Sequence, residues 1–353
     1  MRTLNERRRT PASLSRYSFV LVSGCTLAWS GIAAAQEPAT AAEPAPVAAP
    51  PAEAPLAPDA PEPAPAPHPA KPPPYSLPWQ LRPVAPGNVL RLDTSYGFYK
   101  NPTTNKSGSA ITTSILGSYK IIPDLALIAR LGLVSNSPPD AVAPAKATPS
   151  GTSFLNPVLG GLYGIKLSPS LKLGLFLGVT LPVGSGGGTT PDAGKATANS
   201  VGISTRSAFD NAMFAVDYFT VFPGVDFAFV HSGLTVQGEA TIFKLTKVRG
   251  PDAEDDSKVN LTMGLHAGYF IIPQLSLGAE IRHQRWLSTP TNVKNDKTDT
   301  LRDTTTFAIG PRLHFKLSDK TWFRPGVSLT LPLDYPMNKA EYRVVQLDLP
   351  FSF

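Results

Sequence analysis

Residues 171–181 read LKLGLFLGVTL, and their side chains alternate strictly between two kinds. Leucine or valine occupies every odd position, whereas lysine, glycine, phenylalanine and threonine occupy the even positions. A period of two residues is the period of a β-strand, because successive side chains of a strand point to opposite faces. The same alternation returns over residues 125–133, 259–269 and 307–317. The sequence therefore predicts an all-β fold.

The alternating runs are long, at about 10–13 residues, where a soluble strand typically has about 5–6. The longer figure suits a tilted strand that crosses a bilayer. One face of the runs is continuously apolar, and the other mixes glycine with polar and charged residues, as in a wall between lipid and an aqueous lumen. About twelve strands are expected, over residues 88–99, 109–121, 125–135, 154–167, 171–182, 219–230, 234–247, 258–270, 275–287, 303–317, 321–332 and 341–353.

The links between these runs alternate between short and long. Short links fall at 120–124, 168–170, 231–233, 271–274 and 318–320, and the longest link spans 183–218. Short turns on one side and long loops on the other are typical of outer-membrane barrels. The prediction is a transmembrane antiparallel up-and-down β-barrel with both ends on the short-turn side.

The first 35 residues have the pattern of a secretory signal peptide. Five arginines and one glutamate precede the apolar stretch 17–32, which ends in Ala33-Ala34-Ala35. Cleavage there lowers the formal net charge from +6 to +2, which removes most support for a nucleic-acid partner. An alternative is lipidation at Cys25, because Val22-Ser23-Gly24-Cys25 resembles a lipoprotein box.

Residues 37–74 contain 15 Pro and 13 Ala. Proline fixes φ and removes a backbone donor, so this composition favours an extended, disordered spacer. We expect three parts: a signal peptide at 1–35, a Pro/Ala-rich periplasmic spacer at 36–78 and a β-barrel at 79–353.

The C-terminal residues carry a resemblance to a known class. Counted back from the terminus, alternate positions are apolar and end in an aromatic residue: Phe353, Phe351, Leu349, Leu347 and Val345. This pattern resembles the C-terminal assembly signal of Gram-negative outer-membrane β-barrel proteins, of the porin-like and transporter-like class. Pro350 departs from it by removing one ladder donor. The resemblance implies an outer-membrane location, with outer-membrane lipid or lipopolysaccharide and the barrel-assembly machinery as partners, and peptidoglycan as a candidate partner of the spacer.

The inward face of the predicted barrel carries charged residues and histidines. These lumen candidates are Arg91, Arg130, Arg282, Arg312, Arg324, Asp93, Asp226, Glu239, Glu280, His266 and His314. Separated arginines would favour a pore with a mild anion preference, whereas pairs across the lumen would favour an ionic plug. In the longest loop, Phe209, Met213 and Val216 have helical spacing, so residues 206–219 either fold into the barrel mouth or pack at its rim.

Other motifs give weaker signals. Aromatic residues near strand ends, among them Tyr119, Tyr269, Trp286 and Trp322, are expected in interface girdles. A lipid-modifying enzyme would place a Ser/His pair at the rim, and His283 with Ser288 is the candidate. No cofactor and no metal site are expected.

The favoured function is a porin-like channel or transporter for small solutes, with a mild preference for anions and without enzymatic activity. The alternative is a non-conducting structural barrel that is tethered to the cell wall by its spacer. A lipid-modifying enzyme is the third hypothesis.

Overall fold

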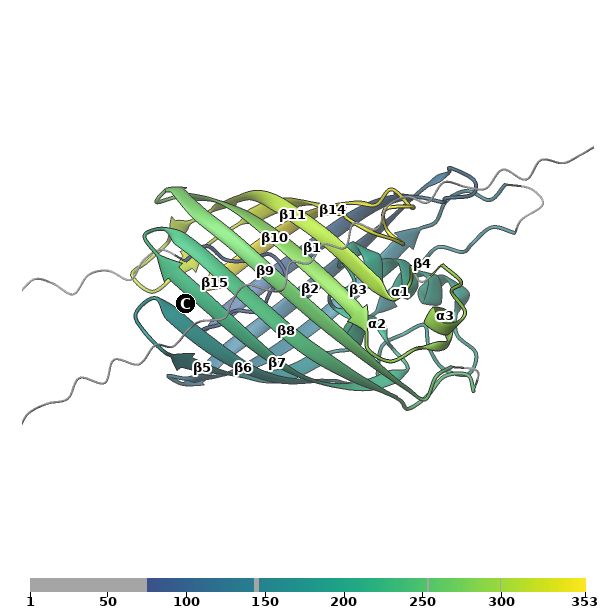
Figure 1. Cartoon of the computed structure of the whole chain (residues 1–353), viewed down its shortest axis with the longest axis horizontal. Coiled ribbons are helices and arrows are strands. Elements are labelled where there is room, and N and C mark those ends of the chain that lie inside the picture. The colour runs from purple at the N-terminus through teal and green to yellow at the C-terminus, as the bar shows by residue number, and fades with distance from the viewer. Residues whose placement is uncertain (1–74, 143–145, 253, 299) are drawn as a thin grey trace, which may run out of the picture. The chain divides into compact units, whose positions relative to one another are not determined.

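The computed structural model describes residues 75–353, apart from 143–145, 253 and 299 (Figure 1). The predicted signal peptide, including Cys25, and residues 36–74 of the predicted spacer lie outside the described residues. Within the described part of the chain, the strands form one continuous sheet that curves round until its first and last strands pair.

The sheet is a closed antiparallel barrel of 12 strands, in the order β1-β2-β3-β5-β6-β7-β8-β9-β10-β11-β14-β15. Its closure is a ten-residue ladder from Val89↔Ser352 to Phe98↔Arg343. A closed ring leaves no unpaired edge, which is a requirement for strands in lipid. The ring strands are β1 (Val89–Lys100), β2 (Ser107–Ile122), β3 (Leu125–Ser137), β5 (Val158–Lys166), β6 (Leu171–Thr180), β7 (Tyr218–His231), β8 (Leu234–Lys247), β9 (Ser257–Ile272), β10 (Leu275–Trp286), β11 (Asp303–Leu313), β14 (Gly326–Pro332) and β15 (Arg343–Ser352).

Three short strands extend this ring. β4 (Gly151–Phe154) pairs with β3 beyond the end of β5, while β12 (Phe315–Lys316) and β13 (Trp322–Phe323) continue β11 and β14 towards the short-turn end. Each of the twelve predicted strands thus has its counterpart in the barrel. The prediction of an up-and-down barrel is confirmed.

The faces of the strands follow the alternation in the sequence. In β6, Leu175 and Leu177 are 46 % and 58 % exposed on the outer face, whereas Phe176 is buried inside. The residues of the proposed C-terminal assembly signal also lie on the outer face of the closing strand, with Phe353 at 55 % exposure. An apolar outer band over a closed barrel is what a lipid environment selects.

The two ends of the barrel differ. Both the first residue of β1 and the C-terminus lie at the end with short turns, and the helices gather at the opposite, long-loop end (Figure 1). One short turn, Ser232–Gly233, joins β7 to β8 with positive φ at both residues, as a two-residue type I′ hairpin requires.

The helices belong to the long loops. They are α1 (Ala193–Thr205), α2 (Asn211–Phe214) and α3 (Thr291–Lys294). In the part of the chain that the structure describes, no helix is long and apolar enough to cross a bilayer.

The inner wall is apolar over one sector and polar over the rest. The apolar sector is built from β3, β5, β6, β7 and β8, where Phe176, Phe222 and Phe243 pack against one another. Gly160 and Gly178 make room for these rings, because a Cβ on either glycine would lie under 3.0 Å from a phenylalanine ring. The barrel interior is therefore a packed core on that side.

Candidate functional site

A short segment before β1 enters the barrel and fills its short-turn half. We call residues 75–86 the N-terminal plug. Trp79 and Leu81 are 1 % and 0 % exposed, so the segment is as deeply buried as a protein core. Pro78, Pro83 and Pro86 favour an extended backbone, which makes no hydrogen bonds within itself. The buried peptide groups therefore need partners from the barrel wall.

Wall carboxylates accept the backbone N–H groups of the plug. The amides of Trp79 and Gln80 donate to Glu280 at 2.8 and 3.2 Å, and the amide of Arg82 donates to Glu239 at 2.6 Å. Hydrogen bonds to a charged acceptor are about twice as strong as neutral ones. Two glutamates thus hold the middle of the plug, residues 79–82.

Wall arginines donate to the plug carbonyls from the other side. Arg312 donates to the carbonyls of Leu77 and Pro78 at 3.1 and 3.3 Å. Arg91 donates to the carbonyls of Pro78 and Trp79. Because both polar sides of the peptide are satisfied by fixed side chains, the wall is complementary to an extended peptide.

The plug also places a cation beside two acids of the wall. Asp226 on β7 and Glu239 on β8 are direct cross-strand neighbours. Two like charges in such positions repel each other and destabilise the sheet. The Arg82 guanidinium lies between them, 3.0 Å from Asp226 and 3.2 Å from Glu239. A cation from the plug therefore offsets one of the two charges of an acidic pair that is buried in the wall.

A second segment enters the lumen from the long-loop end. We call residues 193–214, which contain α1 and α2, the loop plug. α1 begins at Ala193 because the Asp192 side chain accepts the Lys195 amide, a standard N-cap bond. Met213 and Phe214 of α2 are buried against the apolar wall sector, in one cluster with Phe222 and Phe243. The prediction left open whether this loop folds into the mouth or packs at the rim, and the structure places it inside.

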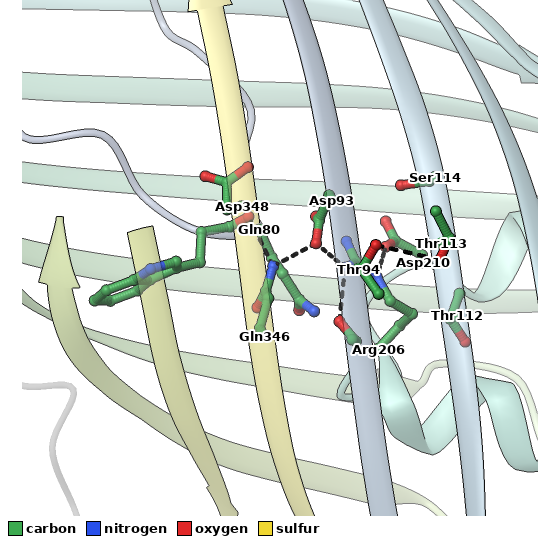
Figure 2. Close-up of polar contacts among 12 residues, drawn as sticks. Gln80, Asp93, Thr94, Thr112, Thr113, Ser114, Arg206, Asp210, Gln346 and Asp348 are labelled. Atoms are coloured by element: carbon green, nitrogen blue, oxygen red, sulfur yellow. Dashed lines mark hydrogen bonds and ion pairs between the residues drawn. The ribbon is translucent and has the colours of Figure 1, made fainter. Parts of the chain in front are cut away.

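Ion pairs fix the loop plug near the middle of the lumen. Arg206 lies 2.8 Å from both Asp93 of β1 and Asp210 of the loop, and Arg130 of β3 lies 2.7 Å from Asp210. Figure 2 shows Arg206 directed at Asp93, which also accepts a 2.9 Å hydrogen bond from Gln346 of β15. A network of this kind fixes the depth to which the loop enters.

Two hollows remain around the loop plug. A cavity of about 70 Å³ lies between the two plugs and is lined by both, with Phe176 on one side and Arg130 and Glu239 on the other. A second hollow of about 780 Å³, the vestibule, lies at the long-loop end and is lined by α1, α2, α3 and the ends of neighbouring strands. The lumen is thus divided into compartments.

The structure locates every lumen residue that the sequence predicted. Arg130 pairs with Asp210, Arg282 with Glu280 at 2.5 Å, and Arg312 with Asp348 at 2.5 Å, which cancels the cationic lining expected from the sequence. Arg324 is half-buried over the Trp322 ring at 5.0 Å. The remaining predicted residues are buried inside the barrel: Arg91, Asp93, Asp226, Glu239, Glu280, His266 and His314.

Two expectations from the sequence need correction. Trp286 does not belong to a lipid-facing girdle, because it has the inward parity of its strand, packs against the internal apolar cluster and lines the vestibule. His283 and Ser288 do not bond to each other. His283 lies 2.9 Å from the Thr305 hydroxyl, and Ser288 accepts the Val259 amide at 2.9 Å.

Sequence reasoning missed the N-terminal plug altogether. Residues 75–78, assigned to the spacer, lie in the lumen. The usable signal was the change from Pro/Ala repeats to Tyr75-Ser76-Leu77-Pro78-Trp79, because aromatic and aliphatic side chains indicate burial. Among the described residues, no group of three or more His, Cys, Asp or Glu side chains could hold a metal ion.

Closure, an apolar outer band and a polar inner face define the class: this chain is an outer-membrane β-barrel. Its fold resembles those of porins and channels. An outer membrane channel from Pseudomonas putida F1 is 15 % identical with a TM-score of 0.48, covering 78 % of this chain and 98 % of that one.

Two further solved barrels show a weaker likeness. The KdgM porin in complex with disordered oligogalacturonate is 10 % identical with a TM-score of 0.40, covering 74 % of this chain and 99 % of that one. LpxR from Salmonella typhimurium is 11 % identical with a TM-score of 0.37, covering 74 % of this chain and all of that one. No family model and no curated protein matches the sequence. At such identities the likeness concerns the barrel, and a function has to rest on this chain's own residues.

Proposed function

We propose that this protein is a gated outer-membrane channel for small solutes, closed at rest by its N-terminal plug and its loop plug. The observation that carries the proposal is the position of Arg82 between Asp226 and Glu239. Two adjacent acids in a permanently packed wall would be costly. In a lumen that water enters when the plug leaves, the same acids would be hydrated.

The contacts of the N-terminal plug suit reversible release. Hydrogen bonds and ion pairs from wall side chains hold its peptide groups and Arg82, and water can replace them, while the buried Trp79 and Leu81 add an apolar cost to release. Only residues 87 and 88 separate the segment from β1, and on its other side it continues into the predicted Pro/Ala spacer. A pull or a partner acting on the spacer would therefore act directly on the plug.

We also propose how the chain reaches the outer membrane. The chain is exported through its signal peptide and is inserted by the barrel-assembly machinery, which reads the terminal Phe353. We propose no catalytic role for the protein; the rim residues His283 and Ser288 have other hydrogen-bond partners.

A specific observation favours the alternative, a structural barrel that never conducts. Ion pairs such as Arg206–Asp93 join the wall to the loop plug, which is the arrangement expected of a permanent ionic plug. In that case the spacer would serve as a tether to peptidoglycan.

Single-channel recording separates the two functions. The intact chain is compared with a doubly opened variant, in which residues 75–86 are replaced by a Gly/Ser linker and residues 189–215 by a short Gly/Ser loop. We expect rare, voltage-dependent steps from the intact chain and sustained steps from the variant.

Each other outcome has a defined meaning. Sustained steps from the variant with permanent silence of the intact chain would support the structural barrel. Silence of a variant that still shows heat-modifiable gel mobility would end the channel proposal, because the wall itself would then block the lumen.

A further inference from the structure

The vestibule is separate from the cavity between the plugs. Residues 208–214 form the partition, because Asn211 and Phe214 line the vestibule while Phe209 and Met213 line the inner cavity. The vestibule has a volume of about 780 Å³, which lies in the range of small-molecule sites. A ligand could therefore occupy the vestibule while the lumen stays closed.

Two buried amide oxygens lack partners in the vestibule wall. Asn199 of α1 and Asn211 of α2 are each 6 % exposed, and in the described part of the chain neither Oδ1 atom accepts a hydrogen bond. The Nδ2 group of Asn199 donates to the Ser185 carbonyl at 2.9 Å, which orients the amide. The Nδ2 group of Asn211 donates to Asn260 at 3.4 Å. A buried acceptor without a donor is costly, so both positions fit a ligand that supplies hydroxyl groups.

The charges of the vestibule are largely balanced within the protein. The Lys258 ammonium lies 3.8 Å from Asp255 and 4.6 Å from the centre of the Tyr218 ring. Asp217 lies 3.1 Å from Arg249. Glu254 adds a further negative charge to the lining. The lining cation Lys258 is thus already paired with Asp255, and the excess of negative charge in the lining disfavours an acidic ligand.

The remaining lining groups are an indole and several amides. Trp286 is turned inwards at the end of β10, and Gln284 lies on the same strand. Asn292 and Asn295 of the loop that contains α3 also line the vestibule. An indole presents a flat apolar surface to C–H groups. Amides both donate and accept hydrogen bonds, as hydroxyl groups do. Together they match the alternating apolar and hydroxyl faces of a sugar.

We propose that the vestibule binds an uncharged, hydroxyl-rich ligand, namely a neutral oligosaccharide of a few units. Its apolar face rests on Trp286, and its hydroxyl groups donate to Asn199 and Asn211. This inference goes beyond the channel function and does not depend on it, because binding requires no opening of the lumen.

Calorimetric titration of the refolded full chain, in a detergent without a sugar headgroup, tests the proposal. The probes are maltotriose and cellotriose as neutral ligands, trigalacturonate as an acidic ligand and a glucosamine trimer as a cationic one. We expect saturable binding of at least one neutral trisaccharide and a weaker signal from the acidic one.

Matched variants locate the site. Asn211→Leu removes one acceptor at nearly constant volume, and Trp286→Leu removes the indole. Each should weaken binding about tenfold, the equivalent of one well-made hydrogen bond or aromatic contact. The controls are Asn338→Leu in a neighbouring loop and Trp322→Leu at the short-turn end, and both should bind as the parent chain does.

The proposal fails under any of three results. These are no binding of either neutral trisaccharide, stronger binding of the acidic or the cationic probe, and full affinity in both vestibule variants. Heat-modifiable mobility of every variant shows that it is folded, so that a loss of binding reports on the site.

Discussion

The two plugs enter the same lumen but differ in local structure and in their main contacts. The N-terminal plug is an extended peptide that is held by side-chain hydrogen bonds and by Arg82 between two acids. The loop plug is helical and packs Met213 and Phe214 onto a wall of phenylalanines. When a plug leaves the lumen, water replaces its polar contacts at a small net cost in free energy. The free energy gained from apolar burial is lost in full. The difference is one of degree, because Trp79 and Leu81 of the N-terminal plug are buried too and Arg206 of the loop plug is ion-paired. Under the proposed channel function, the N-terminal plug is the one that leaves.

The largest effect is expected from Arg82→Ala. It leaves Asp226 and Glu239 buried without their cation, and breaking such a buried pair costs about 3–5 kcal/mol. We expect the N-terminal plug to leave the lumen while the loop plug stays. Limited chymotrypsin digestion should then cut at Tyr75 or Trp79 but not at Phe209. The control is Arg285→Ala, whose pair with Asp303 is exposed, and it should leave the digestion pattern unchanged.

Met213→Ala tests the other plug. Removing a buried methionine from a packed core costs about 2–5 kcal/mol, and here the loss falls on the loop plug. Digestion should shift to Phe209 and Phe214 and spare Trp79. Leu333→Ala, at a side chain that is 52 % exposed, is the matched control. Joint release of both plugs by either variant would show that they act as one unit and would break the comparison.

Neutralising the two acids tests whether Arg82 acts through its charge. Asp226→Asn with Glu239→Gln, added to Arg82→Ala, removes the uncompensated charge. The triple variant should regain most of the protection of Trp79 from digestion, with a residual loss of about 1–2 kcal/mol for the missing hydrogen bonds. The same two substitutions on a chain with Arg82 intact serve as the control. Protection that stays as low as in Arg82→Ala would mean that Arg82 acts by packing, for instance over the Phe176 ring at 4.3 Å.

The smallest effect concerns pH at the long-loop end. The Thr291 hydroxyl donates to Asp255 at 2.6 Å and its backbone amide at 3.0 Å, and these bonds hold the pKa of the Asp255 carboxyl below its usual value. A lowered folded-state pKa gives stability that is present above the ordinary value of about 3.9 and is lost as the pH falls through the folded-state pKa.

Hydrogen exchange at residues 291–295 should therefore be unchanged between neutral pH and pH 5, after correction for intrinsic rates, and should rise in stronger acid. Asp255→Asn should remove this dependence on pH. Since Asp255 lies in a loop and is partly exposed to solvent, the effect should be small. A rise that already begins near neutral pH would contradict the assignment.

Much of the barrel could be predicted because its pattern is local. The strand expected at 234–247 coincides with β8, and the inward parity placed Asp226, Glu239 and Arg282 inside. The girdle interpretation failed for Trp286, although the parity that places Arg282 inside also places Trp286 there. The local pattern also failed to predict α1, whose small and β-branched residues carry no apolar stripe.

The sequence by itself determined the strands, their faces and their pairing order, because a two-residue period and alternating link lengths are properties of neighbours along the chain. Only the tertiary structure decided what fills the lumen. Arg82 meets Asp226 across 144 residues, and the Trp79 amide meets Glu280 across 201. Such contacts depend on barrel closure, which brings distant strands around one axis, and no local pattern in an extended peptide shows which wall will receive it.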